Sequence, residues 1–305
     1  MTTYIIRRLL ESILVLLGAV AITFVITRAT GDPARLMLSD GATAEQLADF
    51  RRDFGLDKPI PVQFVRYIND CLHGDLGKSI RHGLPVTQLI IDKLPNTLKL
   101  TFAAMLISLL LSFPIGVFVA LHRNTFADSA GTIFALNGQA MPSFWVGLML
   151  SFIFGVKLRW LPISGADTRM HLILPAVTLG FYLTGRLTRL IRSSMLEVLE
   201  KEYIRTARSK GILEKVVIWK HALRNASIPV VTYIGLIFAD LLGGAMVIET
   251  VFAWPGVGRL VINAVLQRDF PLVQGVVLFS ALIFVIVNLL VDILYTILDP
   301  RITYK

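Results

Sequence analysis

The chain has a single cysteine, Cys71, among its 305 residues. One thiol can form neither an intrachain disulfide nor a metal cage built from cysteines. The five histidines are scattered, and none shows metal-ligand spacing such as His-Glu-x-x-His. We therefore expect no metal site, no catalytic histidine and no cofactor bound by this chain, and we interpret Cys71 as a free or buried thiol.

Charged residues are also scarce, at 17% of the chain, whereas apolar residues reach 55%. Soluble domains contain about 25% charged and about 45–50% apolar residues. The apolar excess is collected in long blocks, which is typical of membrane-spanning helices. The formal net charge of +9 is not arranged as a face with interleaved aromatic residues. It therefore favours topology-setting charge and argues against nucleic acid as a partner.

The apolar blocks predict an all-α, polytopic membrane protein with about six transmembrane helices. The first block is longer than the apolar region of a signal peptide, and no small-residue cleavage site follows it, so we interpret it as an uncleaved span. In the fourth block, Gly180, Thr184 and Thr188 recur every four residues, a spacing that lets helices approach closely in lipid. The predicted spans are residues 9–27, 98–121, 133–156, 172–191, 228–251 and 272–298.

Residues 28–97 are polar and balanced in charge, and they are too long for a simple loop. Thr43 and Gln46 have the spacing of a capping box, which predicts the start of a helix. A second helix is indicated by one apolar face, formed by Phe64, Val65, Ile68 and Leu72. We predict a small folded extracytoplasmic element here, between an N-terminal segment of residues 1–27 and a five-span core of residues 98–305.

Six spans put both termini on one side of the membrane, and the basic residues decide which side. Fifteen arginines and lysines fall on the side of the termini, ten of them between Arg186 and Arg224, against six in the short loops opposite. The positive-inside rule then predicts that both termini are cytoplasmic.

The segment Gly74–Ser79 looks like the end of a phosphate-binding loop. The motif requires a glycine at position 72, and that position is Leu72. We therefore interpret the segment as a tight glycine turn and not as a nucleotide site.

Polar residues interrupt two of the predicted spans. Asn137, Gln139 and Ser143 lie near Pro142, where a broken helix could expose backbone to a cavity, and Asp240 lies within the fifth span. Polar and charged groups at this depth usually face protein or water. These four residues are our candidates for a translocation path, and the alternative is that they make polar contacts between helices.

The most informative segment is residues 192–227, which connects the fourth and fifth spans and is rich in strong helix formers. Ala207 and Gly211 lie four residues apart and are surrounded by basic residues. Such a face fits a groove of another protein. The same helix could instead lie on anionic lipid headgroups, and the residues alone leave both interpretations open.

This segment resembles the EAA signature of permease subunits in binding-protein-dependent ABC importers. Its core reads Glu202-Tyr203-Ile204 where the signature has Glu-Ala-Ala, a departure that resembles the peptide-type branch. The remaining signature residues are Ala207, Gly211, Ile228 and Pro229. Further matches to the dipeptide/oligopeptide permease family extend along nearly the whole chain, at Tyr4–Leu10, Gly74–Ser79, Pro142–Trp145, Trp160–Gly165, His221–Asn225, Gly243–Gly258 and Asp269–Gly275.

The resemblance implies the architecture of a type I ABC importer in the bacterial inner membrane. This chain would be one of two homologous permease subunits, surrounded by membrane lipid. Two cytoplasmic ATPase subunits would carry ATP and Mg, and an extracytoplasmic binding protein would deliver a peptide or a peptide-like solute. The implied ATPase-coupling residues are Glu202, Tyr203, Ala207, Arg208 and Gly211, and the candidates for contact with the binding protein are Trp254, Arg259 and Asp269.

Two rival functions stay open at this point. A secondary, ion-coupled transporter would need coupling carboxylates and inverted repeats, and we find no internal repeat. A membrane scaffold that transports nothing would not explain the polar interruptions in the third span. Dipeptides, longer peptides, glutathione and nickel chelates are all compatible cargo.

Overall fold

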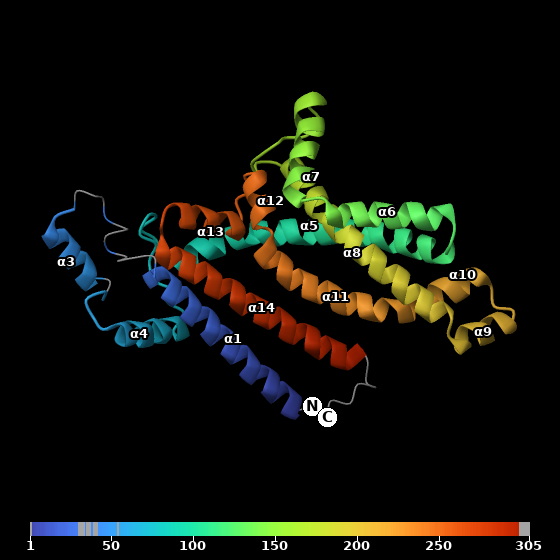
Figure 1. The fold of residues 1–305 in the computed structure, drawn as a ribbon, viewed down its shortest axis with the longest axis horizontal. Coiled ribbons are helices and arrows are strands. Elements are labelled where there is room, and N and C mark those ends of the chain that lie inside the picture. The colour runs from blue at the N-terminus through green and yellow to red at the C-terminus, as the bar shows by residue number, and fades with distance from the viewer. Residues whose placement is uncertain (1, 30–33, 35–37, 39–41, 54, 299–305) are drawn as a thin grey trace. The chain divides into compact units, whose positions relative to one another are not determined.

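The computed structural model is all-helical over the residues that it describes, which are 2–29, 34, 38, 42–53 and 55–298 (Figure 1). The all-α prediction is confirmed. The α-helices are α1 (Thr2–Ala29), α3 (Ala44–Asp53), α4 (Ile60–Leu72), α5 (Val86–Leu121), α6 (Phe126–Ala140), α7 (Ser143–Leu150), α8 (Ile173–Leu199), α9 (Glu202–Ser209), α10 (Glu214–Val216), α11 (Leu223–Gly244), α12 (Met246–Val251), α13 (Val257–Leu266) and α14 (Phe270–Leu298). Short irregular helices complete the fold: the π-helices η1 (Ser151–Lys157) and η3 (Val217–Ala222), and the 3₁₀-helix η2 (Arg169–Leu172).

Each of the six predicted spans falls on helical structure. Within the described residues, two helices are long and apolar enough to cross a membrane by themselves: α5 and residues 270–291 of α14. A third crossing is possible if α6 and the helical segment Ser143–Lys157 count together as one broken span. Several apolar spans are thus present, and the number six stays a prediction.

The predicted third span is broken where the sequence places Pro142. Met141 ends α6 with extended backbone angles, φ −78° and ψ 133°, and Pro142 precedes α7. A proline disfavours the helical conformation of the residue before it, and it has no N–H to continue the ladder. The two halves consequently meet at an angle of 100°.

The chain divides into two compact units. The first consists of residues 1–96, 256–286 and 304–305, and the second of residues 97–255 and 287–303. The division of the sequence into segments 1–27, 28–97 and 98–305 stays a prediction.

In the second unit, α8 is the central helix and packs against α6 and α11 (Figure 1). Glycines allow this close packing: a Cβ placed at Gly180 would lie 3.0 Å from the carbonyl oxygen of Ala104 on α5, and one at Gly185 would lie 2.3 Å from that of Ala135 on α6. Thr184 and Thr188 on the same helix are buried. The predicted packing face with four-residue spacing is therefore confirmed.

In the first unit, the predicted capping box is formed. The Gln46 amide donates to the Thr43 hydroxyl at 3.3 Å, and the Gln46 side-chain oxygen accepts from the Thr43 amide at 2.9 Å. On α4, Phe64 packs against Phe24 of α1 with ring centroids 5.2 Å apart, whereas Leu72 is 81% exposed, so only part of the predicted apolar face is covered within this chain. Cys71 is a free, half-buried thiol whose pKa is raised by burial.

A glycine-rich turn in the first unit replaces the phosphate-binding loop that the sequence superficially resembles. Gly77 and Gly83 have φ of +82° and +67°, angles that favour glycine over any residue with a Cβ. The Asp75 carboxylate accepts from the Gly77 amide at 2.8 Å, and the Ser79 amide donates to the carbonyl of Leu84 at 2.9 Å. The interpretation of Gly74–Ser79 as a tight turn is confirmed.

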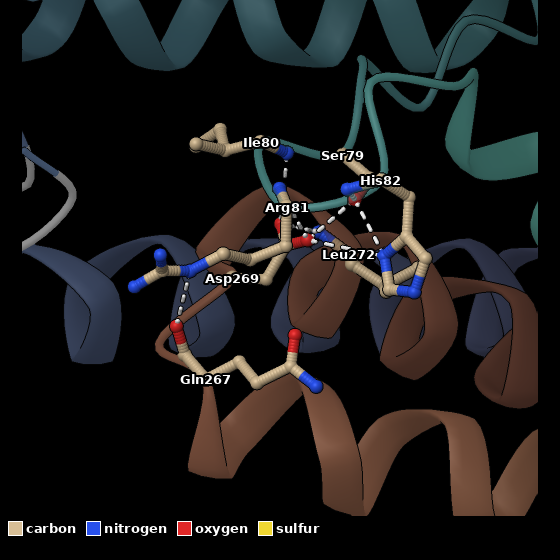
Figure 2. A network of polar contacts seen from close by, with 7 residues as sticks. All are labelled: Ser79, Ile80, Arg81, His82, Gln267, Asp269 and Leu272. Carbon is tan, nitrogen blue, oxygen red and sulfur yellow. Dashed lines mark hydrogen bonds and ion pairs between the residues drawn. The ribbon is translucent and has the colours of Figure 1, made fainter.

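This turn wraps around the carboxylate of Asp269, which immediately precedes α14 (Figure 2). The carboxylate accepts from the Ser79 hydroxyl at 2.5 Å and from the amides of Ile80 and Arg81, both at 3.3 Å. It also accepts from the Leu272 amide at 3.4 Å, as an N-cap residue does. Asp269 and Ser79 are each only 1% exposed, so the buried charge depends on these four donors.

We predict that Asp269→Ala destabilises the protein by about 1–3 kcal/mol, because it leaves buried donors without an acceptor. Hydrogen exchange of the amides of residues 80 and 81 should accelerate in the purified protein. Asp75→Asn is the matched control, since its side-chain oxygen can still accept from Gly77. Unchanged exchange at residues 80 and 81 in Asp269→Ala would show that the network does not hold the turn.

We predict that Gly185→Ala lowers the free energy of unfolding by about 1–3 kcal/mol, because its Cβ overlaps a backbone oxygen that cannot rotate away. Thermal unfolding of the purified protein in detergent measures this loss. Gly18→Ala serves as the control, because a Cβ at Gly18 meets nothing within 4 Å. A Gly185→Ala protein that unfolds no earlier than the wild type contradicts the proposed close packing.

Candidate functional site

Helix α9 is a short helix with defined ends in the segment 192–227. It follows Lys201, which has extended backbone angles (φ −70°, ψ 148°), and its C-cap residue is Lys210. Beyond it, the Gly211 amide donates to the carbonyl of Arg208 at 2.9 Å, and the Ile212 amide donates to that of Ala207 at 3.4 Å. This is the Schellman arrangement, in which the residue after the C-cap adopts a left-handed conformation. Gly211 has the required φ of +73°.

The two faces of α9 differ sharply. Ile204 is fully buried and Ala207 is 8% exposed, and both belong to the hydrophobic core of the second unit. Glu202, Tyr203 and Arg208 lie on the exposed side. A helix held by two inward residues thus presents a charged and aromatic face outward.

The two residues of the predicted close-approach face lie in different surroundings, and their contact with a partner stays a prediction. Ala207 is occupied by packing inside its own chain. Gly211 lies beyond the end of α9, where its positive φ favours glycine and a Cβ would meet no atom of this chain within 4 Å. The exposed side of α9 is available for contact with another subunit.

An ion pair fixes how α9 leads into the next helix. Arg208 binds the carboxylate of Glu214, the first residue of α10, with nitrogen–oxygen distances of 3.1 and 2.6 Å. These hydrogen bonds hold the pKa of Glu214 below its ordinary value. Both side chains are about half exposed, so the pair mainly sets geometry and adds little stability.

A cavity of about 700 Å³ lies between α6, α8 and α11, and three arginines of α8 line it. Arg192 binds Asp128 through two bonds of 2.8 and 2.9 Å. Arg189 donates to the side-chain oxygen of Gln139 at 3.0 Å. Arg186 lies 4.7 Å from the centre of the Tyr182 ring and donates to its hydroxyl.

Of the four predicted path residues, the structure brings only Gln139 to this cavity. Asn137 is exposed and donates to the carbonyl of Ile133 in its own helix at 2.9 Å. Ser143 is half-buried at the start of α7 and is not among the lining residues of the cavity. The side chain of Asp240 lies outside the described residues. A path role for these four residues stays a prediction.

The cavity arginines were not predicted as site residues, because basic residues near the end of a span also set membrane topology. Their spacing carried the signal: Arg186, Arg189 and Arg192 recur every three residues, which places them on one side of a helix that also carries a predicted span.

Two of the three candidate contacts with a binding protein lie inside the chain. Trp254 is 4% exposed and belongs to the hydrophobic core of the second unit, and Asp269 is enclosed by the turn at residues 79–82. Neither side chain is exposed in this structure, and their contact with a binding protein stays a prediction. Arg259 is half-buried on α13 and keeps its candidate role.

Comparison with known proteins gives agreement over nearly the whole chain. Residues 112–304 match the family described as binding-protein-dependent transport system inner membrane component, and residues 1–101 match the N-terminal part of such membrane components. The glutathione transport system permease protein GsiC of Pectobacterium atrosepticum is 44% identical over 306 residues. The oligopeptide transport system permease protein AppB of Bacillus subtilis is 42% identical over 316 residues. Both alignments cover 100% of this chain and 100% of the relative.

The fold also recurs in a solved transporter. A chain of the methionine ABC transporter MetNI, in its inward-facing conformations, superimposes with a TM-score of 0.59 at 16% identity. The similarity covers 70% of this chain and 97% of that chain, and at this identity it shows the fold alone. The family matches and the identity to these permeases show that this chain belongs to the binding-protein-dependent transport system inner membrane components and is an ABC transporter permease, not an ATPase.

Proposed function

We propose that the chain is one of two homologous permease subunits that together form the translocation pathway of an importer for peptides or peptide-like solutes. Two cytoplasmic ATPase subunits supply the energy from ATP and Mg, and an extracytoplasmic binding protein delivers the solute. The observation that carries the proposal is the end-to-end identity of 42–44% to permeases of glutathione and oligopeptide systems. Within that class, glutathione and short peptides share carboxylate, ammonium and amide groups, which suits a polar cavity such as the one at Gln139.

We assign the exposed side of α9 to contact with an ATPase subunit. Glu202, Tyr203 and Arg208 offer charge and an aromatic ring, and the buried Ile204 and Ala207 tie the helix to the core of the second unit. Movement of an ATPase subunit would therefore move α9 together with the helices it packs against, as in shear or rigid-body transitions. The burial of Ile204 and Ala207 supports this interpretation over a helix inserted among lipid headgroups, because the aliphatic side of α9 is occupied by the protein itself.

We propose that the segment 192–227 and both termini lie on the cytoplasmic side. The distribution of basic residues supports this orientation, although Arg301 and Lys305 lie outside the described residues. The turn at residues 79–82 and helix α13 then lie on the opposite side, where the binding protein docks.

The proposal predicts that affinity-tagged chain, purified in mild detergent from its native host, brings a second permease and ATPase subunits with it. Reversal of charge on the exposed side, as in Glu202→Arg with Arg208→Glu, should remove the ATPase subunits and leave the second permease bound. Arg169→Glu is the matched control, because Arg169 is exposed on η2, outside the segment 192–227. Uptake that persists without ATP and follows a proton gradient would refute the proposed function.

A second prediction concerns the end of α9. Gly211→Val should reduce solute uptake by about tenfold while the assembly still inserts and hydrolyses ATP. The reason is that a β-branched residue in the left-handed conformation costs at least about 1–2 kcal/mol, so the Schellman end opens and α9 loses its fixed position. Gly211→Asn should retain most uptake, because asparagine tolerates positive φ. Normal uptake by Gly211→Val, measured with radiolabelled peptide in whole cells, would contradict the coupling role of α9.

A further inference from the structure

Two arginines of the cavity between α6, α8 and α11 differ from the third in their surroundings. Among the side chains that the structure describes, Arg192 is neutralised by Asp128, whereas no carboxylate lies within ion-pair distance of Arg186 or Arg189. Arg189 uses one of its five donors on Gln139, and Arg186 is held against the Tyr182 ring. The cavity therefore carries two positive charges with most of their donors unused.

Arg186 is half-buried and Arg189 is exposed, so each guanidinium can meet water or a bound anion. Arg186 and Arg189 belong to the helix of the predicted fourth span, three residues apart and on one side. Like charges at this spacing repel each other, and charges in a spanning helix are expensive unless they face water or an anion. A structural role alone would be met by pairing each arginine, as Asp128 does for Arg192.

We propose that this cavity binds the carboxylate groups of an anionic peptide-like solute, with Arg186 and Arg189 as its ligands. This inference rests on the proposed function, because the solute is the transported cargo. A guanidinium matches a carboxylate through two parallel N–H···O bonds, and Arg189 can keep its bond to Gln139 while it forms them. The Tyr182 ring fixes the plane of Arg186, so less side-chain freedom is lost when an anion binds.

The lining also offers polar groups to a peptide-like solute. Thr132, Ser193 and Tyr233 add hydroxyl groups beside Gln139, and these can donate to and accept from peptide groups. Leu136 and Leu190 are the aliphatic residues among those that line the cavity. The volume of about 700 Å³ lies within the range of about 300–1,000 Å³ that is typical of small-molecule sites.

The test uses the intact assembly in nanodiscs of zwitterionic phosphatidylcholine, with glutarate as the probe. Glutarate carries two carboxylates, and glutaramide has the same carbon chain without charge. We expect glutarate to raise the unfolding temperature of the wild type and glutaramide to leave it unchanged. The double variant Arg186→Gln/Arg189→Gln should need about tenfold more glutarate for half of the shift, because each lost pair removes a charge-assisted bond. Arg169→Gln, an exposed arginine outside the cavity, should respond like the wild type.

The second variant, Arg189→Lys, keeps the positive charge but lacks the planar guanidinium that can donate two parallel hydrogen bonds to a carboxylate. It should weaken glutarate binding without altering the unfolding temperature in the absence of probe. Equal stabilisation by glutaramide, or an unchanged glutarate midpoint in both cavity variants, overturns the proposal. A last set of measurements uses nanodiscs that contain anionic phosphatidylglycerol. If that lipid stabilises the wild type over the double variant and glutarate has no effect in either membrane, the site holds a lipid headgroup and the solute assignment falls.

The two proposals fail in different measurements. A purified chain that brings no ATPase subunits refutes the transport assembly, and that result does not involve glutarate. An assembly that contains its ATPase subunits but binds glutarate equally well with and without Arg186 and Arg189 refutes the carboxylate site only.

Discussion

The second unit of this permease depends on the close approach of backbones around α8. In lipid there is little hydrophobic force between helices, so association relies on van der Waals packing and on polar contacts that close packing makes available. Gly180 and Gly185 bring the backbones of α5 and α6 against α8. Gly138 does the same from the side of α6, where a Cβ would lie 2.9 Å from the carbonyl oxygen of Phe181. These contacts pack the three helices closely together, which would favour movement of α8 with its neighbours.

That close packing matters because α8 joins three features in sequence. Its glycine-rich part packs the core, its arginines line the cavity, and its end leads through Glu200 and Lys201 into α9. Arg123, which follows α5, donates a hydrogen bond of 2.9 Å to the carboxylate of Glu200. This bond links the C-terminal end of α8 to the end of α5. A change at α9 is consequently connected to the cavity by a single helix and its packed neighbours. This is a physical route for coupling, and the variants at Gly211 and at the cavity arginines probe its two ends.

The sequence was informative where the interactions are local. The capping box at Thr43 and Gln46, the break at Pro142 and the glycine turn before Ser79 all depend on residues within a few positions of one another, and each was predicted. The burial of Asp269 and Trp254 was not predicted. Three of the four donors to Asp269 lie about 190 residues earlier in the chain, and no spacing rule connects them to it. The burial of Ala207 was not predicted for a related reason, since it depends on the core of the second unit, to which Val217 also belongs.

The arginines of α8 show how one residue type can satisfy two constraints. Counted along the chain, they contribute to the excess of basic residues that sets topology. In the structure, Arg192 forms an ion pair with Asp128. Arg186 and Arg189 line the same cavity. Membrane topology requires basic residues only near the end of a span, and it does not depend on which side of the helix carries them. The recurrence every three residues is therefore more than orientation demands. This spacing is explained if the same arginines both orient the helix in the membrane and bind an anion that passes through the protein.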